Sequence, residues 1–155
     1  MSAIRSPLPD DARTVTGEAL QGMVVDLVDL SLFGKQLHWN VTGRAFRSIH
    51  LQLDQVVDVA RRHTDLAAER AVAIGVNPDG QVETIARRSK IHGVETGYVQ
   101  DEKVVRMMAD VLADVIARTR DRMDATAEPD PVTQDLIIGA LKELEMQHWM
   151  FQAMI

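Results

Sequence analysis

The chain has 155 residues, of which 46% are hydrophobic, and its formal net charge is −6 with a pI near 5.3. This length fits a single domain with a sizeable core, and the acidic balance argues against a nucleic-acid-binding protein. The absence of cysteine excludes a disulfide framework, a zinc–thiolate site and a thiol nucleophile.

Two features of the sequence set the expected compartment. The chain has no run of about 18 apolar residues that could cross a membrane. Its N-terminal sequence, MSAIRSPLPDDAR, lacks the apolar centre of a signal peptide. We therefore expect a cytoplasmic protein without a membrane partner, with association with the nucleoid as a further placement inside the cell.

The N-terminal half reads as a short tail and two long helices. Residues 1–12 contain two prolines and are predicted to form a flexible tail. Apolar residues then recur every three or four positions from Arg13 to about Thr42 and again from Phe46 to Ile74, which predicts two amphipathic helices. Gly34 lies on the apolar face of the first helix, where it allows a neighbouring helix to approach closely. Gly43 is expected to end that helix as a left-handed cap.

The C-terminal half reads as a long crossover and two further helices. Residues 75–100 exceed an ordinary connection between helices and include one weakly helical stretch, Gln81–Lys90. The third long helix is expected from about Gln100 to Thr126, and the fourth begins at Pro131 with Asp130 in the capping position. This order predicts an all-α fold with a single domain over residues 13–155. One long crossover between the second and third helices is the arrangement of ferritin-like four-helix bundles.

Two pairs of metal-capable side chains lie on the second helix. His50 and Asp54 form one pair and Asp65 and Glu69 the other, and each pair projects from one helix face because its members are four residues apart. The centres of the pairs are about fifteen residues, or ~22 Å, apart along the axis, whereas metal–ligand bonds are ~2.0–2.6 Å long. One helix cannot bring both pairs to one ion. A second, antiparallel copy related by a two-fold axis near Val59–Ala60 can do so.

The stretch from His38 to Arg70 resembles the Dps-like mini-ferritins, the DNA-binding proteins from starved cells, which belong to the ferritin-like superfamily. The resemblance implies a ferroxidase centre shared by two subunits, with His38, His50 and Asp54 of one subunit and Asp65 and Glu69 of the other as iron ligands. The matching motifs are His38-Trp39-Asn40-Val41-x-Gly43, Phe46, His50-x-x-x-Asp54 and Asp65-x-x-x-Glu69-Arg70.

The resemblance also implies an activity, in which Fe(II) is oxidised preferentially by hydrogen peroxide, with oxygen slower. The Fe(III) would be stored as mineral in a hollow dodecameric shell built from two-fold dimers. The residue types suit iron, since imidazole and carboxylate bind Fe(II) and no thiolate is present to form a closed zinc site. Trp39 is implied to donate electrons to radicals near the centre, with a packing aromatic as the alternative. Each ligand taken alone also has a structural alternative, as a core histidine or a surface carboxylate.

Other polar residues receive weaker assignments. Asp135, with Asp130 near it, is implied to line an iron-entry pore at a three-fold axis of the shell, where negative charge attracts Fe²⁺. The alternative for Asp135 is an acidic residue favoured by the dipole at the start of the last helix. His63 is placed at the surface. His148, within Glu145-x-x-His148, is expected to be a core or interface residue, because the second helix lacks the matching element of classical ferritin sites.

The resemblance does not extend to a DNA-binding tail. The first twelve residues hold one cation, Arg5, against Asp10 and Asp11, and no basic run follows the last predicted helix. Because phosphate contacts supply most non-specific affinity, DNA binding is expected to be weak or absent. A DNA-compacting structural protein of the nucleoid and a metal-binding shell with little turnover remain as alternatives to the ferroxidase.

Overall fold

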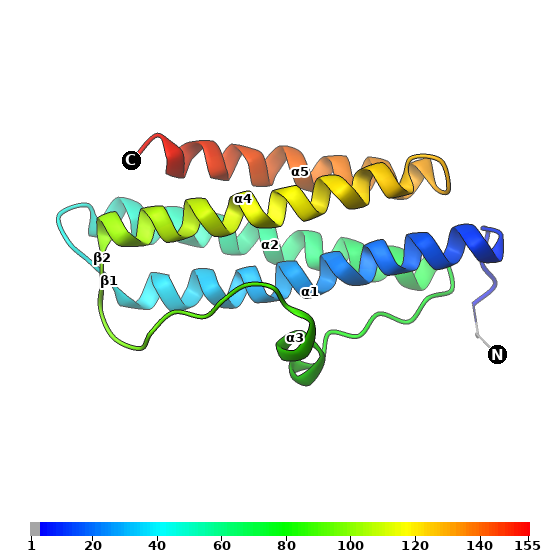
Figure 1. Ribbon diagram of the computed structural model, residues 1–155, viewed down its shortest axis with the longest axis horizontal. Helices are drawn as coiled ribbons and strands as arrows, with labels where there is room; N and C mark the ends of the chain where they lie inside the picture. The colour runs from blue at the N-terminus through cyan, green and yellow to red at the C-terminus, as the bar shows by residue number, and fades with distance from the viewer. Residues whose placement is uncertain (1–3) are drawn as a thin grey trace.

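The computed structural model describes residues 4–155 and has four long helices packed side by side in a bundle (Figure 1). A short helix lies in the crossover between the second and third long helices, as predicted from the sequence, and it packs against the first long helix. None of the helices formed by residues 4–155 combines the length and apolar character that a bilayer-spanning segment needs. In chain order the elements are α1 (Asp10–Asn40), β1 (Val41–Thr42), α2 (Phe46–Ala73), α3 (Val82–Arg88), β2 (Val99–Gln100), α4 (Asp101–Thr126) and α5 (Pro131–Gln152).

No side-chain hydrogen bond caps the start of any of the four long helices, and Asp130 occupies the predicted N-cap position of α5 without making one. α1 and α4 each begin with acidic residues, Asp10 and Asp101 first, which favour the positive end of the helix dipole. α5 has Pro131 at its first position, where the missing N–H costs nothing. α1 begins at Asp10, three residues earlier than predicted and inside the segment expected to be a tail.

The turn after α1 differs from the prediction. The helix ends at Asn40 instead of Thr42, because Val41–Thr42 pairs in parallel with Val99–Gln100. Gly43 follows this strand with a φ of +132° and is therefore a turn residue, not the helix cap. A Cβ atom at Gly43 would lie 2.3 Å from the carboxyl carbon of Asp101, which accepts a hydrogen bond of 2.8 Å from the Ala45 N–H. These contacts fasten the α1–α2 turn to the start of α4.

The core lies between the two helical hairpins, α1–α2 and α4–α5. At Gly34 a Cβ atom would lie 2.9 Å from Val57 Cγ2, so the absence of a side chain allows the close approach of α1 and α2 that the sequence predicts. These two helices also carry all five predicted iron ligands. The largest fully buried side chains are Leu20, Met23, Leu27, Leu30, Leu37, Ile49, Leu53, Ile74, Met108, Leu112, Ile137 and Phe151.

Hydrogen bonds join α1 to the crossover at three points, one of which is a contact of 3.4 Å between Arg88 and Glu18. The Gln21 side chain donates to the Asp79 carbonyl and accepts from the Asp79 N–H, each at 2.8 Å. Further along, the Ser89 hydroxyl donates to the Asp29 carboxylate. The Asp79 carboxylate also accepts from the Thr84 hydroxyl at 2.6 Å, and this bond above all holds the pKa of Asp79 below its usual range. The first part of the crossover is therefore attached to α1 by side-chain to backbone and side-chain to side-chain bonds.

Candidate metal centre

His38 and His50 face each other across the junction of α1 and α2. The Nδ1 atom of His38 lies 2.9 Å from the carbonyl oxygen of His50, and the Nδ1 atom of His50 lies 2.9 Å from the carbonyl oxygen of His38. The rings are stacked with their centroids 3.6 Å apart. A carbonyl only accepts, so each Nδ1 carries a hydrogen, and in a neutral imidazole each Nε2 then keeps its lone pair. The fold thus selects the tautomer in which both Nε2 atoms can bind a metal ion.

The end of α1 explains why this pair forms. The last four carbonyl groups of a helix lack amide partners within it, and His38 belongs to the last turn of α1. The Nδ1–H group of His50 supplies a donor to one of these carbonyls. The strand pairing and the Asp101 contact hold the same end of the bundle, so the two imidazoles lie in a region fixed by several independent bonds.

Asp54 joins the histidine pair, and Lys35 joins Asp54. The Lys35 Nζ atom lies 2.5 Å from Asp54 Oδ1, and His38 Nδ1 lies 3.3 Å from the same oxygen. The hydrogen bond from Lys35 is the largest cause that holds the pKa of Asp54 below its usual range, so the carboxylate is ionised at neutral pH. Sequence reasoning missed Lys35. Its position three residues before His38, on the same face of α1, was the available signal.

Asp65 and Glu69 lie apart from these three residues. Both are exposed on α2, and neither side chain has a hydrogen bond or ion pair with any of residues 4–155. Across that part of the chain, no group of three or more histidine, aspartate and glutamate side chains is arranged to hold a metal ion. The subunit places His38 beside His50 and Asp54 without forming a three-ligand metal site, and it leaves Asp65 and Glu69 apart from them.

The aromatic neighbour of His38 is not part of the core of its own chain. Trp39 is 67% exposed and lines a shallow groove with Leu32, Phe33 and Val94. Packing inside the subunit therefore does not explain why a large aromatic side chain occupies this position. Its role as an electron donor stays a prediction.

The two predicted pore residues have different surroundings. Asp135 is exposed in the second turn of α5. Asp130 is only 3% exposed, and its Oδ2 atom lies 2.7 Å from Arg70 Nη2 and 2.5 Å from Thr133 Oγ1. Burial alone would raise the pKa of Asp130, but the hydrogen bonds from Thr133 and Arg70 outweigh it and hold the pKa below its usual range. The charge of Asp130 is thus neutralised inside the subunit, whereas that of Asp135 faces solvent.

The surface assignment of His63 is wrong. His63 is 4% exposed, and its Nε2 atom lies 3.0 Å from Glu143 Oε1 on α5, where Arg62 also binds Glu143 through two contacts of 2.7 Å. The signal was present in the sequence, because His63 follows Val56 and Ala60 at helical spacing and all three face the core. By contrast Glu145, next to the half-buried His148, is paired with Arg120 on α4.

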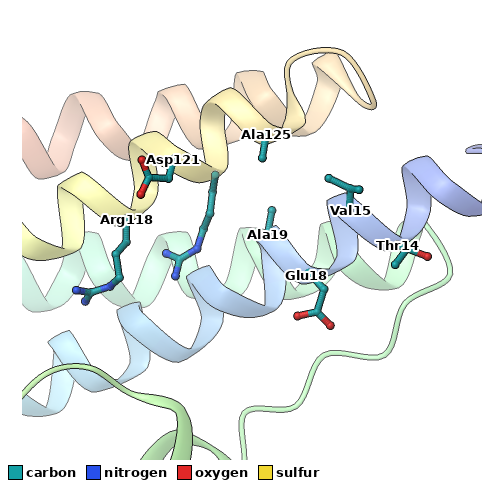
Figure 2. A pocket seen from close by; sticks show the side chains of 8 residues that line it. Thr14, Val15, Glu18, Ala19, Arg118, Asp121 and Ala125 are labelled. Carbon is teal, nitrogen blue, oxygen red and sulfur yellow. The ribbon is translucent and has the colours of Figure 1, made fainter.

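The pocket between α1 and α4 is not a second candidate (Figure 2). Arg118 and Arg122 of α4 line this pocket, and both bind the buried Asp26 of α1. Arg118 contacts both oxygens of that carboxylate, at 3.0 and 3.1 Å, and Arg122 Nη1 lies 2.8 Å from Oδ2. This cluster ties α1 to α4, and no histidine is among the residues that line the pocket.

Comparisons with known proteins agree with this fold. A family model described as a ferritin-like domain matches residues 17–155. The DNA protection during starvation protein of Mycolicibacterium smegmatis is 32% identical over 148 residues, which cover 94% of this chain and 80% of that protein. DNA protection during starvation protein 2 of Deinococcus radiodurans is 28% identical over 138 residues, and the match spans 89% of this chain but 57% of that longer relative.

Solved structures give the same answer. The structure of Dps from Microbacterium arborescens in the high iron form matches with a TM-score of 0.91 and 28% identity, covering 97% of each chain. The tetragonal form of Mycobacterium smegmatis Dps matches with a TM-score of 0.92 and 28% identity, covering 99% of this chain and 93% of that one. The chain therefore belongs to the ferritin-like family, and within it to the Dps mini-ferritins.

Proposed function

We propose that this protein is a ferroxidase and iron store whose metal centre is shared between two subunits. Membership of the Dps family supports a role in iron storage and DNA protection. The observation that carries the proposal is the paired hydrogen bonding of His38 and His50, which leaves two Nε2 atoms free beside an ionised Asp54. Asp65 and Glu69 of the partner subunit complete the ligand set.

The chemistry of the two half-sites is complementary. The histidine half offers two neutral nitrogen ligands and one carboxylate whose charge Lys35 now balances. The other half offers two carboxylates without a partner in their own chain. Together the two half-sites supply negative charge, which stabilises Fe(III) more than Fe(II) because Fe(III) carries the larger positive charge. The site therefore favours the oxidised ion.

The substrates are Fe(II) and hydrogen peroxide, with oxygen as a slower oxidant. Two Fe(II) ions give one electron each to one peroxide, which takes up two protons and leaves as two waters. The Fe(III) product is stored as mineral inside a dodecameric shell. Because iron and peroxide are consumed together, the protein protects the DNA and the cell in the cytoplasm without needing to hold the nucleic acid. Asp135 contributes to the pore through which Fe²⁺ enters, while Trp39 donates electrons to radicals that escape the centre.

The test compares two double variants that lose the same charge. Protein is loaded with Fe(II) without oxygen, hydrogen peroxide is added, and the ferric absorbance is recorded. Asp65→Ala with Glu69→Ala is expected to abolish fast oxidation. Asp110→Ala with Asp114→Ala is the control, because these exposed carboxylates on α4 have the same spacing and lie outside the site. Equal slow rates in wild type and both variants would reject the ferroxidase in favour of a metal-binding shell with little turnover.

A separate experiment addresses the nucleic acid. We expect no stable complex with duplex DNA at physiological salt, because the chain has a net charge of −6 and phosphate contacts need cations. A gel-shift series at low and moderate salt measures this. Retention of DNA that resists salt would support the compaction alternative.

A further inference from the structure

Two charged side chains near the midpoint of α2 have no partner in their own chain. Asp58 and Arg61 are both exposed, and neither side chain has an ion pair or hydrogen bond with any of residues 4–155, including each other. The neighbouring Arg62, in contrast, is bound by Glu143 on α5. A carboxylate and a guanidinium three residues apart are within reach of each other on a helix. Their separation here leaves both charges available to another molecule.

Asp58 and Arg61 lie on the same face of α2 as the predicted ligands. The intervals from Asp54 through these two residues to Asp65 are four, three and four, which keeps all of them on one side of the helix. Val59 and Ala60, at the midpoint between the two ligand pairs, are 5% and 0% exposed and face the core of their own subunit. The exposed side chains nearest the midpoint are therefore Asp58 and Arg61.

The proposed shared centre fixes what lies opposite these side chains. In an antiparallel pair of α2 helices related by a two-fold axis at Val59–Ala60, each residue faces the one equally far beyond the midpoint. Asp54 then faces the partner's Asp65, and His50 faces the partner's Glu69. The same rule places Asp58 opposite the partner's Arg61, at the same level along the axis. The exposed stripe of α2 is therefore complementary in charge to a second copy of itself.

We propose that Asp58 of each subunit forms an ion pair with the partner's Arg61, giving two pairs that flank the two-fold axis. This inference rests on the proposed function, because the position of the axis comes from the shared metal centre. It goes further by assigning what holds the two subunits in register. The pairs lie between the two metal centres and hold both sets of ligands at the correct level. Charged pairs of this kind contribute more to register and to the choice of partner than to bulk affinity.

The test is charge reversal followed by mixing. Asp58→Arg brings two like cations together across the axis, and Arg61→Asp brings two carboxylates together. Each variant alone is expected to weaken subunit association about a hundredfold, measured by sedimentation velocity over a range of concentrations. Reversals at two exposed α4 residues, Asp110→Arg and Arg106→Asp, are the matched control. Mixing these two variants should give no preference for mixed dimers.

Mixing separates an effect between subunits from an effect within the helix. In an equal mixture of Asp58→Arg and Arg61→Asp subunits, a mixed dimer has opposite charges at both contacts. Each chain in that dimer still has like charges within its own α2. Recovery of association, with mixed dimers counted by native mass spectrometry, can therefore come only from the contact between subunits. The control reversals on α4 should show no such preference for mixed dimers.

Three results would overturn the inference. The first is normal association of both single variants, and the second is weakened association that mixing does not restore. If far-UV circular dichroism shows that a reversal unfolds the chain, Asp58→Asn and Arg61→Gln replace it. Each should then weaken association about tenfold, with the double variant no weaker than either one. The third result that would overturn the inference is a double variant whose loss of association equals the sum of the two single losses. Because the readout is assembly, restored mixed dimers that fail to oxidise Fe(II) would count against the ferroxidase and leave the ion pairs standing.

Discussion

The two halves of the predicted ligand set differ in how they are held. Each of His38 and His50 binds the other's backbone carbonyl, which fixes both rings in one tautomer. Asp54 is bound by Lys35. Asp65 and Glu69 project from the same helix into solvent, with no partner among residues 4–155. α2 carries residues of both halves, so the difference comes from α1, which contributes His38 and Lys35 to the first half only. One half-site is organised by its own fold, whereas the other is open to a second subunit.

Replacing one ligand from each half separates their roles. We expect His38→Ala and Glu69→Ala each to slow Fe(II) oxidation about a thousandfold, or ~4 kcal/mol, because each removes one ligand of the proposed shared centre. Only His38→Ala should also lower the free energy of unfolding, by about 1–3 kcal/mol, since a buried and hydrogen-bonded ring is lost. Stopped-flow absorbance and urea unfolding measure the two effects. Equal losses of stability would show that the halves are held alike.

The open half has an anchor on another face of α2. Arg70, beside Glu69, donates to Asp130 and to Thr133 at the start of α5. We expect Arg70→Met to cost about 3 kcal/mol of unfolding free energy, because the buried Asp130 carboxylate is left without its cation. Urea unfolding provides the measurement. Adding Asp130→Asn to this variant should recover part of the loss, and a further loss instead would mean that Arg70 stabilises the fold by packing alone.

In the half-site that the fold organises, the ammonium group of Lys35 already lies beside the Asp54 carboxylate. A divalent ion that binds Asp54 has to displace the ammonium group, which lies 2.5 Å from Oδ1. We expect Lys35→Met to increase the affinity for Co²⁺, a substitute that does not oxidise under these conditions, by about tenfold, or ~1.4 kcal/mol. Anaerobic calorimetry measures this affinity, and Lys90→Met on the crossover is the control. Weaker binding would show instead that Lys35 positions the carboxylate for the ion.

Acid should affect the two halves unequally, and this is the smallest expected effect. Burial opposes the charge of Asp130, yet the bonds from Thr133 and Arg70 leave its folded pKa below the unfolded value of about 3.9. The stability it contributes is present above that pH and is lost as pH falls through the folded pKa. Asp54 has a pKa shifted in the same direction, mainly by Lys35, but it is half exposed. Below pH ~4 the decrease of the unfolding free energy with falling pH should therefore be shallower in Asp130→Asn than in Asp54→Asn.

The parts of the molecule that sequence predicted are those set by local periodicity. The four long helices and the crossover follow from residues three and four apart, and the i,i+4 ligand pairs need only one helix to be placed on a common face. The pairing of Val41 with Val99 and the bond between Ala45 and Asp101 join residues far apart in the chain, so no local pattern announces them. Lys35 was missed for a related reason, because its partner belongs to another helix.

His63 shows a different kind of miss. Its polar side chain suggested the surface, but the position in the repeat pointed to the core, where Glu143 supplies a hydrogen bond. When residue type and periodicity disagree on a helix, the periodicity determines the direction of the side chain and the neighbours adapt to it.

The attachment of the crossover also divides the molecule. Gln21 and Asp29, which hold the crossover at Asp79 and Ser89, both belong to α1, whereas β2 continues directly into α4. Within residues 4–155 the crossover is the only covalent connection between the two helical hairpins, and its residues 93–97 lie between these two attachments. A cut in that stretch would leave two fragments, each with its own anchors, that remain together through the core and the β1–β2 pairing. New chain termini, or an inserted domain, could be placed there without disturbing either half-site.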